Sequence, residues 1–530
     1  MKKTICLTLG IAMMASLVAE AGSGPAESAD VSVSASDEAL TSSKDTITIA
    51  VEGTIANLDA KEGVVNQSQN VYSIVGESLL KEVNNDQGLP TMTTDGSITE
   101  SYEVDEENSG IIYHLKQGVA MQDGTELNAD DVVTSVMHMQ DGTYYADIDY
   151  DDVHAVDDYT VFIGVSAIGQ PVINKVSTIP IFSKEAYEKV NNDGLFFTAD
   201  YVSCGQYMIT DWVQGDSVTV EKFDDYYGGK PPIDKVVFRI FSEPSVAMME
   251  LQTGGVDVIM SPDYQNYQDV VDGKYENLKA ESATGNMLFS IYFNMNSDKL
   301  QDYRVRQAIA LCLDRKAISD GTFNGSGTLS YRILGATYEG LTTYDESSWP
   351  IEHDVDKAKQ LMEEAGYGDG MELKLISHNA STYYSTMGEI FANQVKEIGI
   401  TVDVEIYEPA TFKSTQNQLE GWDVSTTSPN TSYVTNASDF LNNALIGSMH
   451  CDARPTEGYE DAEKICTSLK SETDENKIAE LNAEFEKDYF DNWLWWVPIQ
   501  LSGVYTLENN SLEGFERCQN VIDLSQARFN

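Results

Sequence analysis

Residues 354–378 read DVDKAKQLMEEAGYGDGMELKLISH, and this stretch decides the fold class. Asp354 is a residue type that caps helices, and the apolar residues after it recur at helical spacing. Gly366 is the type of residue that ends a helix, and beyond it apolar and polar residues alternate as in a strand. The stretch therefore predicts one helix followed by one strand.

The same unit recurs elsewhere in the chain. Residues 386–408, TMGEIFANQVKEIGITVDVEIYE, repeat the helix, a glycine stop at Gly399 and a strand. Residues 242–260, SEPSVAMMELQTGGVDVIM, place a helix before Gly254 or Gly255 and a strand after it. Successive helix and strand units of this length build layered lobes. The predicted fold class is therefore α/β.

The first third of the chain also combines predicted helices and strands. Residues 111–139, IIYHLKQGVAMQDGTELNADDVVTSVMHM, predict a strand, a turn at Asp123 and Gly124, and a helix capped by Asn128. Residues 151–165, DDVHAVDDYTVFIGV, predict two strands around a turn. These segments also favour an α/β domain.

The N-terminus has the pattern of a secretory signal. Residues 1–21, MKKTICLTLGIAMMASLVAEA, place two lysines before a short apolar run and end in small residues. Residues 22–44 are small, polar and acidic, and we expect a flexible linker there, with the folded part from residue 45. We therefore expect a secreted protein, in the periplasm or at the outer face of the cell membrane.

The amino-acid composition limits the kinds of partner that the protein is expected to bind. There are 33 Lys and Arg residues against 86 Asp and Glu residues, a formal net charge of −53. So negative a chain is not expected to bind nucleic acid, and we expect a monomer. Beyond the signal segment the cysteines are scattered. Cys451 and Cys466 could pair in an oxidising compartment, but the sequence leaves their pairing open.

The motifs of common enzymes and metal sites are missing. The chain has no His-Glu-x-x-His, no Gly-x-Ser-x-Gly and no phosphate loop, and its six histidines are isolated. A calcium loop over residues 147–158 needs glycine at the sixth position, where Asp152 stands. We therefore expect no enzyme, no catalytic residues, no metal and no cofactor.

Four ordered blocks carry a family resemblance. They are YEVDEENSGIIYHLKQGVAMQDGTELNADDVVTSV (102–136), CGQYMITDWVQGDSVTVEKFDDYYGGKPPIDKVVFRI (204–240), ELQTGGVDV (250–258) and IYFNMNSDKLQDYRVRQAIALCLDRKAI (291–318). Together they resemble the extracytoplasmic solute-binding proteins of family 5, the receptors of ABC importers for oligopeptides and dipeptides. Within the last block, we expect scaffold roles for Arg304, Arg306, Asp314 and Arg315.

The resemblance implies a periplasmic-binding-protein fold of type II, with two lobes, a hinge and an additional inserted domain. Lobe I is expected from residues 45–72, 203–283 and 496–530. The inserted domain is expected over residues 73–202, and lobe II over residues 284–495. Closure of the two lobes around a ligand is the hinge motion that such a fold implies.

The resemblance also implies where ligand contacts come from. The candidates are loop and strand-end residues that face the space between the lobes: Glu52, Gly53, Thr54, Tyr292, Asn294, Trp422, Asn430 and Tyr433. Trp495 and Trp496 could pack a ligand or the hinge, and core packing is favoured.

Residues 421–433, GWDVSTTSPNTSY, depart from the pattern of peptide-binding members. Those members place an aspartate after the Gly-Trp element to pair with the α-amino group of the ligand. Here no carboxylate stands between Asp423 and Asp439, and we expect Asp423 to be structural. This departure puts recognition of a free amine in doubt.

The expected function is that of a substrate-binding receptor of an ABC transporter, which captures a peptide or peptide-like solute outside the cell and delivers it to a membrane permease. A neutral polar wall with tryptophan and tyrosine would also suit an oligosaccharide or another polar solute. A secreted hydrolase and a surface adhesin are the remaining alternatives.

Overall fold

The computed structural model describes residues 44–61, 66–84, 90–140, 142, 145–191, 193–330, 332–333, 351–379, 381–428, 458–472, 474–518 and 521–530. Within these residues, eleven strands form one sheet in the order β10, β11, β12, β1, β13, β19, β14, β18, β16 and β17, with β15 also paired to β19. Their bounds are β10 Tyr207–Val213, β11 Ser217–Lys222, β12 Lys235–Phe241, β1 Thr46–Glu52, β13 Val258–Met260, β19 Trp496–Asn509, β14 Leu278–Phe293, β18 Val424–Thr427, β16 Met371–His378, β17 Ile400–Tyr407 and β15 Thr328–Leu329.

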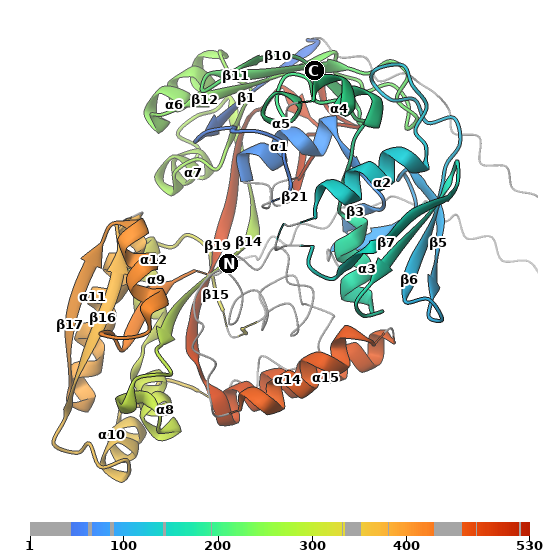
Figure 1. The fold of residues 1–530 in the computed structure, drawn as a ribbon. Coiled ribbons are helices and arrows are strands. Elements are labelled where there is room, and N and C mark those ends of the chain that lie inside the picture. The colour runs from blue at the N-terminus through green and yellow to red at the C-terminus, as the bar shows by residue number, and fades with distance from the viewer. Residues whose placement is uncertain are drawn as a thin grey trace, which may run out of the picture. The chain divides into compact units, whose positions relative to one another are not determined.

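Two long antiparallel strands, β14 and β19, join the two halves of this sheet (Figure 1). They have 16 and 14 residues, against about 5–6 for a typical strand. The pairing runs from Leu278 opposite Asn509 to Tyr292 opposite Trp496, with register shifts in β14 between Thr284 and Ser290. We call this pair the β14–β19 ribbon. The predicted lobe boundaries at 283/284 and 495/496 fall within or at the end of its strands.

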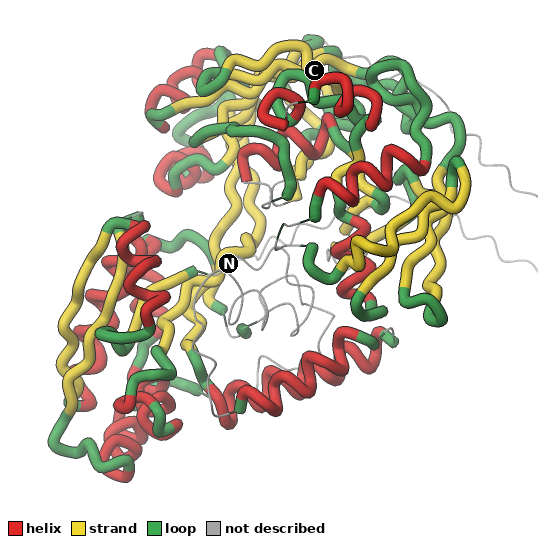
Figure 2. Tube along the Cα trace, viewed as in Figure 1, coloured by secondary structure: helices red, strands yellow, loops and turns green. Residues whose placement is uncertain are grey.

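One half of the sheet, with strands β10 to β13 and β1, belongs to what we call lobe I. Strand β1 is parallel to both β12 and β13. Its side chains alternate between two cores: Ile47, Ile49 and Val51 pack on the side of helix α1, and Ala50 packs on the side of α6 and α7. Helices therefore cover both faces of this half (Figure 2). The helices are α1 Asn66–Val75, α6 Pro244–Thr253 and α7 Tyr264–Val271.

The other half, with strands β16 to β18, belongs to what we call lobe II. Strand β16 is parallel to both β17 and β18. The largest core cluster lies here and includes the C-terminal helices before β19. The helical segments are η1 Asp298–Leu300, α8 Tyr303–Cys312, α9 Arg315–Phe323, α10 Val355–Glu364, α11 Thr382–Gln394, η4 Val395–Ile398, α12 Pro409–Gln418, α14 Tyr459–Lys470, α15 Glu475–Asp488 and the π-helical η6 Tyr489–Trp493.

The predicted helix and strand units are confirmed. The side chain of Asp354 accepts a hydrogen bond from the amide of Lys357 at 2.9 Å and caps α10. Gly254, Gly366 and Gly399 stand at helix ends with φ of 80°, 88° and 81°. These are left-handed conformations in which glycine has no steric penalty, so each glycine ends its helix before a strand of the sheet.

A separate four-stranded antiparallel sheet, in the order β5, β6, β8 and β7, forms the core of the inserted domain. Asn128 caps α2 in a reciprocal capping box with Asp131, and the amide and hydroxyl of Thr125 donate to the Asp123 carboxylate in the predicted turn. Most of residues 147–158 form strand β7. The bounds are β5 Thr99–Asp105, β6 Gly110–Leu115, α2 Ala129–His138, β7 Ile148–Asp157, β8 Thr160–Val165 and α3 Gln170–Ser177.

Shorter elements complete the described parts. Two-stranded pairings join β2 with β9, β3 with β4, β20 with β23 and β21 with β22. Among the described helices, none combines the length and the hydropathy that crossing a bilayer requires. The remaining bounds are β2 Glu77–Ser78, β3 Lys81–Asn84, β4 Pro90–Thr93, β9 Pro180–Ile181, α4 Lys184–Val190, α5 Asp193–Phe196, β20 Leu512–Glu513, β21 Glu516–Cys518, β22 Val521–Asp523 and β23 Arg528–Phe529.

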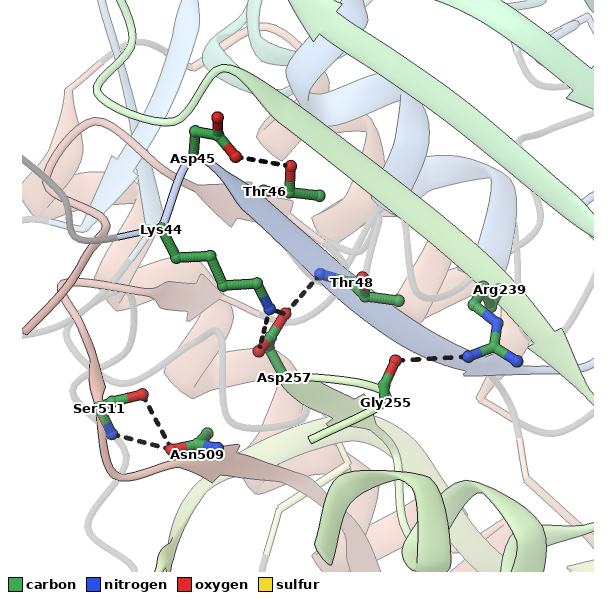
Figure 3. A network of polar contacts seen from close by, with 9 residues as sticks. All are labelled: Lys44, Asp45, Thr46, Thr48, Arg239, Gly255, Asp257, Asn509 and Ser511. Atoms are coloured by element: carbon green, nitrogen blue, oxygen red, sulfur yellow. Dashed lines mark hydrogen bonds and ion pairs between the residues drawn. The ribbon is translucent and has the colours of Figure 1, made fainter. Parts of the chain in front are cut away.

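A buried carboxylate ties the start of β1 to its neighbours (Figure 3). The ammonium of Lys44 lies 2.8 and 2.7 Å from the two carboxylate oxygens of Asp257, whose side chain is 4% exposed. The amide of Thr48 donates to the same carboxylate at 2.8 Å, and the amide of Asn509 donates to the Asp257 carbonyl at 2.9 Å. The hydrogen bonds of Asp257 thus connect strands β1, β13 and β19.

The four charged residues of the last family block have the predicted scaffold roles. Arg306 is fully buried and donates to the backbone carbonyls of Leu300, Gln301 and Trp493. Arg304 pairs with Asp302, Asp314 caps α9, and Arg315 donates to the carbonyl of Ser330.

Candidate ligand-binding site

The strand pairing shows in which direction the carboxyl ends of the parallel strands point. Along β13, the partners in β19 go from Glu508 to Thr506, so β13 and its parallel neighbours run toward lobe II. Along β18, the partners in β14 go from Phe293 to Ser290, so β18 and its parallel neighbours run toward lobe I. The carboxyl ends of both parallel sets therefore point toward each other along the ribbon, and α/β proteins bind ligands outside such ends.

On the lobe I side, β1 ends at Glu52. One carboxylate oxygen of Glu52, Oε1, is buried and has no hydrogen-bond partner within the described residues. Burial, with a smaller contribution from the nearby charge of Asp263, raises the pKa of Glu52. Asp263 itself caps α7 by accepting from the amide of Asn266 at 2.9 Å. Among the described residues, the edge of lobe I thus presents a carboxylate without a positive partner.

Gly53 and Thr54 follow on the same edge, and both are exposed. Gly53 has a φ of 85°, and a Cβ atom there would lie 3.2 Å from Nε2 of Gln67. Both features favour glycine, because a side chain would be strained and would also crowd the glutamine. The chain therefore turns tightly after Glu52.

On the lobe II side, β16 ends at His378. Its ring lies 3.9 Å from the ring of Tyr384 and 4.7 Å from that of Phe412, centroid to centroid. Burial lowers the pKa of His378, so the imidazole is neutral near pH 7. The hydroxyls of Tyr384 and Ser428 are 2.5 Å apart, and this bond links α11 to the residue after β18. This edge is aromatic and uncharged at these positions.

Between the two edges, the ribbon contacts a loop of lobe II. The hydroxyl oxygen of Tyr505 accepts a hydrogen bond from the amide of Gly327 at 2.6 Å. The Tyr505 ring lies 5.2 and 4.5 Å from the rings of Tyr264 and Tyr267 in α7. Gln500, buried in the ribbon, donates to the carbonyl of Ser326 at 2.6 Å. These contacts connect both lobes to the middle of the ribbon.

Tyr292 and Asn294, predicted to touch the ligand, are buried in lobe II, at 2% and 1% exposure. The Tyr292 ring packs 5.1 Å from that of Trp496. The amide nitrogen of Asn294 donates to the carbonyls of Leu419 and Trp422 at 3.1 and 2.8 Å. These contacts hold β14 to the segment before β18. Ligand contact by either side chain stays a prediction.

The tryptophans of the candidate set are also interior residues. Trp422 is 3% exposed and packs in the core of lobe II, and Trp495 and Trp496 are fully buried. The core packing that the sequence favours for the last two is confirmed. Ligand contact by Trp422 stays a prediction, and Asn430 and Tyr433 lie outside the described residues.

Asp423 has the structural role predicted for it. Its carboxylate accepts hydrogen bonds from the amide of Lys374 at 2.8 Å, the ammonium of Lys299 at 2.9 Å and the hydroxyl of Ser297. Its carbonyl accepts from the amide of Asn294 at 2.8 Å. These contacts hold the start of β18 in place, so the carboxylate is committed to the scaffold.

Sequence reasoning missed several residues around the candidate site, notably Asp263, His378, Tyr384 and Tyr505. His378 could have been found, because it directly ends the alternating run that predicts β16. Tyr505 could not, because its approach to Gly327 depends on a pairing between segments 178 residues apart.

A sheet shared by two lobes, whose parallel strands end toward one another, defines the class of two-lobed solute-binding proteins. The profile of the bacterial extracellular solute-binding proteins, family 5 Middle, matches residues 94–448. The chain belongs to this family, whose members are non-enzymatic transport receptors of ABC importers.

Two relatives illustrate the range of the family. The oligopeptide-binding protein AppA of Bacillus subtilis is 26% identical over 364 residues, which cover 62% of this chain and 66% of that protein. The heme-binding protein A of Haemophilus influenzae is 25% identical over 355 residues, covering 61% and 64%. The matched part of the chain thus spans just under two thirds of the length of these relatives.

Structural similarity covers a larger part of the chain than these sequence alignments do. The structure of HbpA2 from Haemophilus parasuis superposes with a TM-score of 0.77 and 22% identity, covering 92% of this chain and 100% of that one. The predicted type II fold with an additional domain is confirmed.

Proposed function

We propose that the protein is the substrate-binding receptor of an ABC importer, which captures a peptide or peptide-like solute outside the cytoplasm and delivers it to a membrane permease. The observation that carries the proposal is the convergence of two sets of parallel strand ends along one ribbon. A ligand placed between these ends touches both lobes, so its binding free energy favours the closed form.

Glu52 supports a ligand with a positive group. A buried ammonium or guanidinium needs an anionic partner, because leaving it unpaired costs several kcal/mol. The segment after Trp422 has no carboxylate beyond Asp423, and Asp423 is held by Lys299. Glu52, with a buried oxygen that has no partner in the described part of the chain, offers the missing anion from lobe I instead. We propose that it binds the amino group or a basic side chain of the ligand.

The burial of the tryptophans weakens the oligosaccharide alternative. Sugar rings stack on accessible aromatic faces, whereas Trp422, Trp495 and Trp496 are at most 3% exposed. A sugar ligand would therefore depend on other side chains.

The test is calorimetric titration and thermal shift of the purified protein with tripeptides, N-acetylated versions of the same tripeptides, and oligosaccharides. A ligand at a hundredfold excess over its Kd stabilises the folded state by about 2.7 kcal/mol, which thermal shift detects easily. We expect free tripeptides to bind and acetylated ones to bind at least tenfold more weakly. Stabilisation by oligosaccharides but by no peptide would overturn the proposal.

A matched pair of variants assigns the amine contact. Glu52→Gln removes the charge at the strand end, whereas Glu243→Gln removes an exposed charge elsewhere in lobe I. We expect only the first variant to lose the preference for the free amine. If both variants keep it, another group binds the ammonium and the role of Glu52 is wrong.

A further inference from the structure

A row of aromatic rings lies at the lobe II edge of the candidate site. Neighbouring ring centroids are 4.6 Å apart between Phe323 and Phe289, 5.7 Å between Phe289 and Tyr384, and 3.9 Å between Tyr384 and His378. Phe412 extends the row beyond His378. These rings come from α9, β14, α11, β16 and α12, so five separate segments build one aromatic cluster.

Tyr383 adds an accessible ring to this row. It packs 5.0 Å from Phe323 and 6.0 Å from Phe289, yet it is 37% exposed, while Phe323 and Phe289 are almost completely buried. Its position is fixed by the buried rings below it, so little conformational entropy is lost when a ligand covers it.

His378 supplies a polar atom at the same place. Its Nδ1 is buried and has no hydrogen-bond partner among the described residues. A buried polar atom without a partner is costly, and such atoms are usually satisfied in native structures. A ligand that donates to or accepts from this nitrogen would remove that cost.

The row lies where a ligand is expected on independent grounds. His378 is the last residue of β16, and Tyr384 bonds to Ser428, the residue after β18. Both strands end toward lobe I, as their pairing requires. The aromatic cluster therefore lies beside the space between the two sets of strand ends.

We propose that the exposed ring of Tyr383, held in place by Phe323 and Phe289, forms with His378 a subsite of lobe II that binds an aromatic side chain of the ligand, with Nδ1 of His378 as its polar contact. The inference rests on the proposed function and narrows it to peptides with an aromatic residue at a fixed position. An aromatic ring gains both buried area and ring-to-ring contact there, whereas a small aliphatic side chain gains neither.

The test uses the full protein and a positional set of tripeptides, with alanine at two positions and phenylalanine, leucine or alanine at the third. Isothermal titration calorimetry measures each Kd. We expect phenylalanine at one position to bind at least tenfold more tightly than alanine, and more tightly than leucine. Tyr383→Ala is expected to remove most of this ratio, and Tyr383→Phe to retain it.

Two further variants test whether changes in peptide binding are specific to the subsite. Leu195→Ala removes an exposed apolar side chain from α5, away from β16 and β18, and is expected to leave the phenylalanine-to-alanine ratio unchanged. His378→Phe retains an aromatic ring without the nitrogen, and is expected to weaken binding of tyrosine and histidine peptides more than of phenylalanine peptides. Circular dichroism confirms that each variant is folded.

The outcomes distinguish the two proposals. If alanine tripeptides bind but phenylalanine gives no gain at any position, the subsite is wrong while the receptor function stands. An equal loss of phenylalanine and alanine binding in Tyr383→Ala also overturns the subsite. If no peptide binds under any condition, the proposed function fails and the subsite with it.

Discussion

The amide of Gly327 donates a hydrogen bond of 2.6 Å to the hydroxyl oxygen of Tyr505, and this bond joins lobe II to the lobe I half of the β14–β19 ribbon. The ring of Tyr505 is held at the same time by Tyr264 and Tyr267 of α7. One side chain thus contacts both lobes beside the register shifts of the ribbon, which is where bending of the sheet requires the least disruption of pairing.

Tyr505→Phe keeps the ring contacts and removes the acceptor for the Gly327 amide. We expect the free energy of unfolding to fall by about 1 kcal/mol, because the Gly327 amide loses its acceptor in a partly buried hydrogen bond. Urea denaturation measures the change. Tyr367→Phe is the control, because no hydroxyl bond is found for Tyr367 in the described part of the chain. An equal effect in both variants would contradict the role of the Gly327 bond.

Glu77 makes stability depend on pH. Its carboxylate accepts from the hydroxyl of Tyr226 at 2.8 Å where β2 meets lobe I. Burial raises the pKa of Glu77 from 4.5 to about 7, although Tyr226 and the charge of Lys81 lower it. The folded state therefore binds the proton more tightly, and its stability falls as pH rises from about 4.5 to about 7, by at most about 3 kcal/mol.

Thermal melts of Glu77→Gln between pH 4 and 8 test this dependence. The neutral amide cannot ionise, so we expect the variant to lose the decline in melting temperature over that window. Glu188→Gln, at an exposed position of α4, is expected to retain the decline of the parent protein. The assignment fails if Glu77→Gln declines as steeply as the parent.

Arg306→Met is expected to be strongly destabilising. The substitution leaves the carbonyls of Leu300, Gln301 and Trp493 without their buried donor, and we expect a loss of at least about 3 kcal/mol or no soluble protein. Arg304→Met is the matched control two residues away. It removes a partly exposed ion pair with Asp302, which contributes about 0–1 kcal/mol. Equal denaturation midpoints for the two variants would contradict the difference.

Asp423→Asn tests whether this carboxylate acts in the scaffold alone. We expect a loss of about 1.5–3 kcal/mol in stability, because the side chain accepts from Lys299, Ser297 and the amide of Lys374. The ratio of Kd values for free and acetylated tripeptides is expected to stay unchanged, as measured by calorimetry. A selective loss of free-amine binding would instead make Asp423 a ligand contact.

Local structure was predictable because its causes are local. Asp354, Asn128 and the glycines at 254, 366 and 399 act within four or five residues of themselves, through capping bonds and left-handed backbone. Asp423 was also interpreted correctly, from its place beside the Gly-Trp element.

The site was less predictable because its residues meet through long-range pairing. Asn294 and Trp422 stand where the family pattern suggests ligand contact, yet the carbonyl of Trp422 is bonded to the Asn294 side chain inside lobe II. The aromatic row joins Phe289, Phe323 and Tyr383 from three segments, and no periodicity within one segment reveals such a meeting.

The salt bridge between Lys44 and Asp257 fixes where the chain enters the large sheet. Lys44 precedes the amino end of β1, whereas the ligand is expected beyond the carboxyl end of the same strand. The salt bridge and the strand pairing therefore anchor this entry point at the end of β1 that lies away from the proposed ligand.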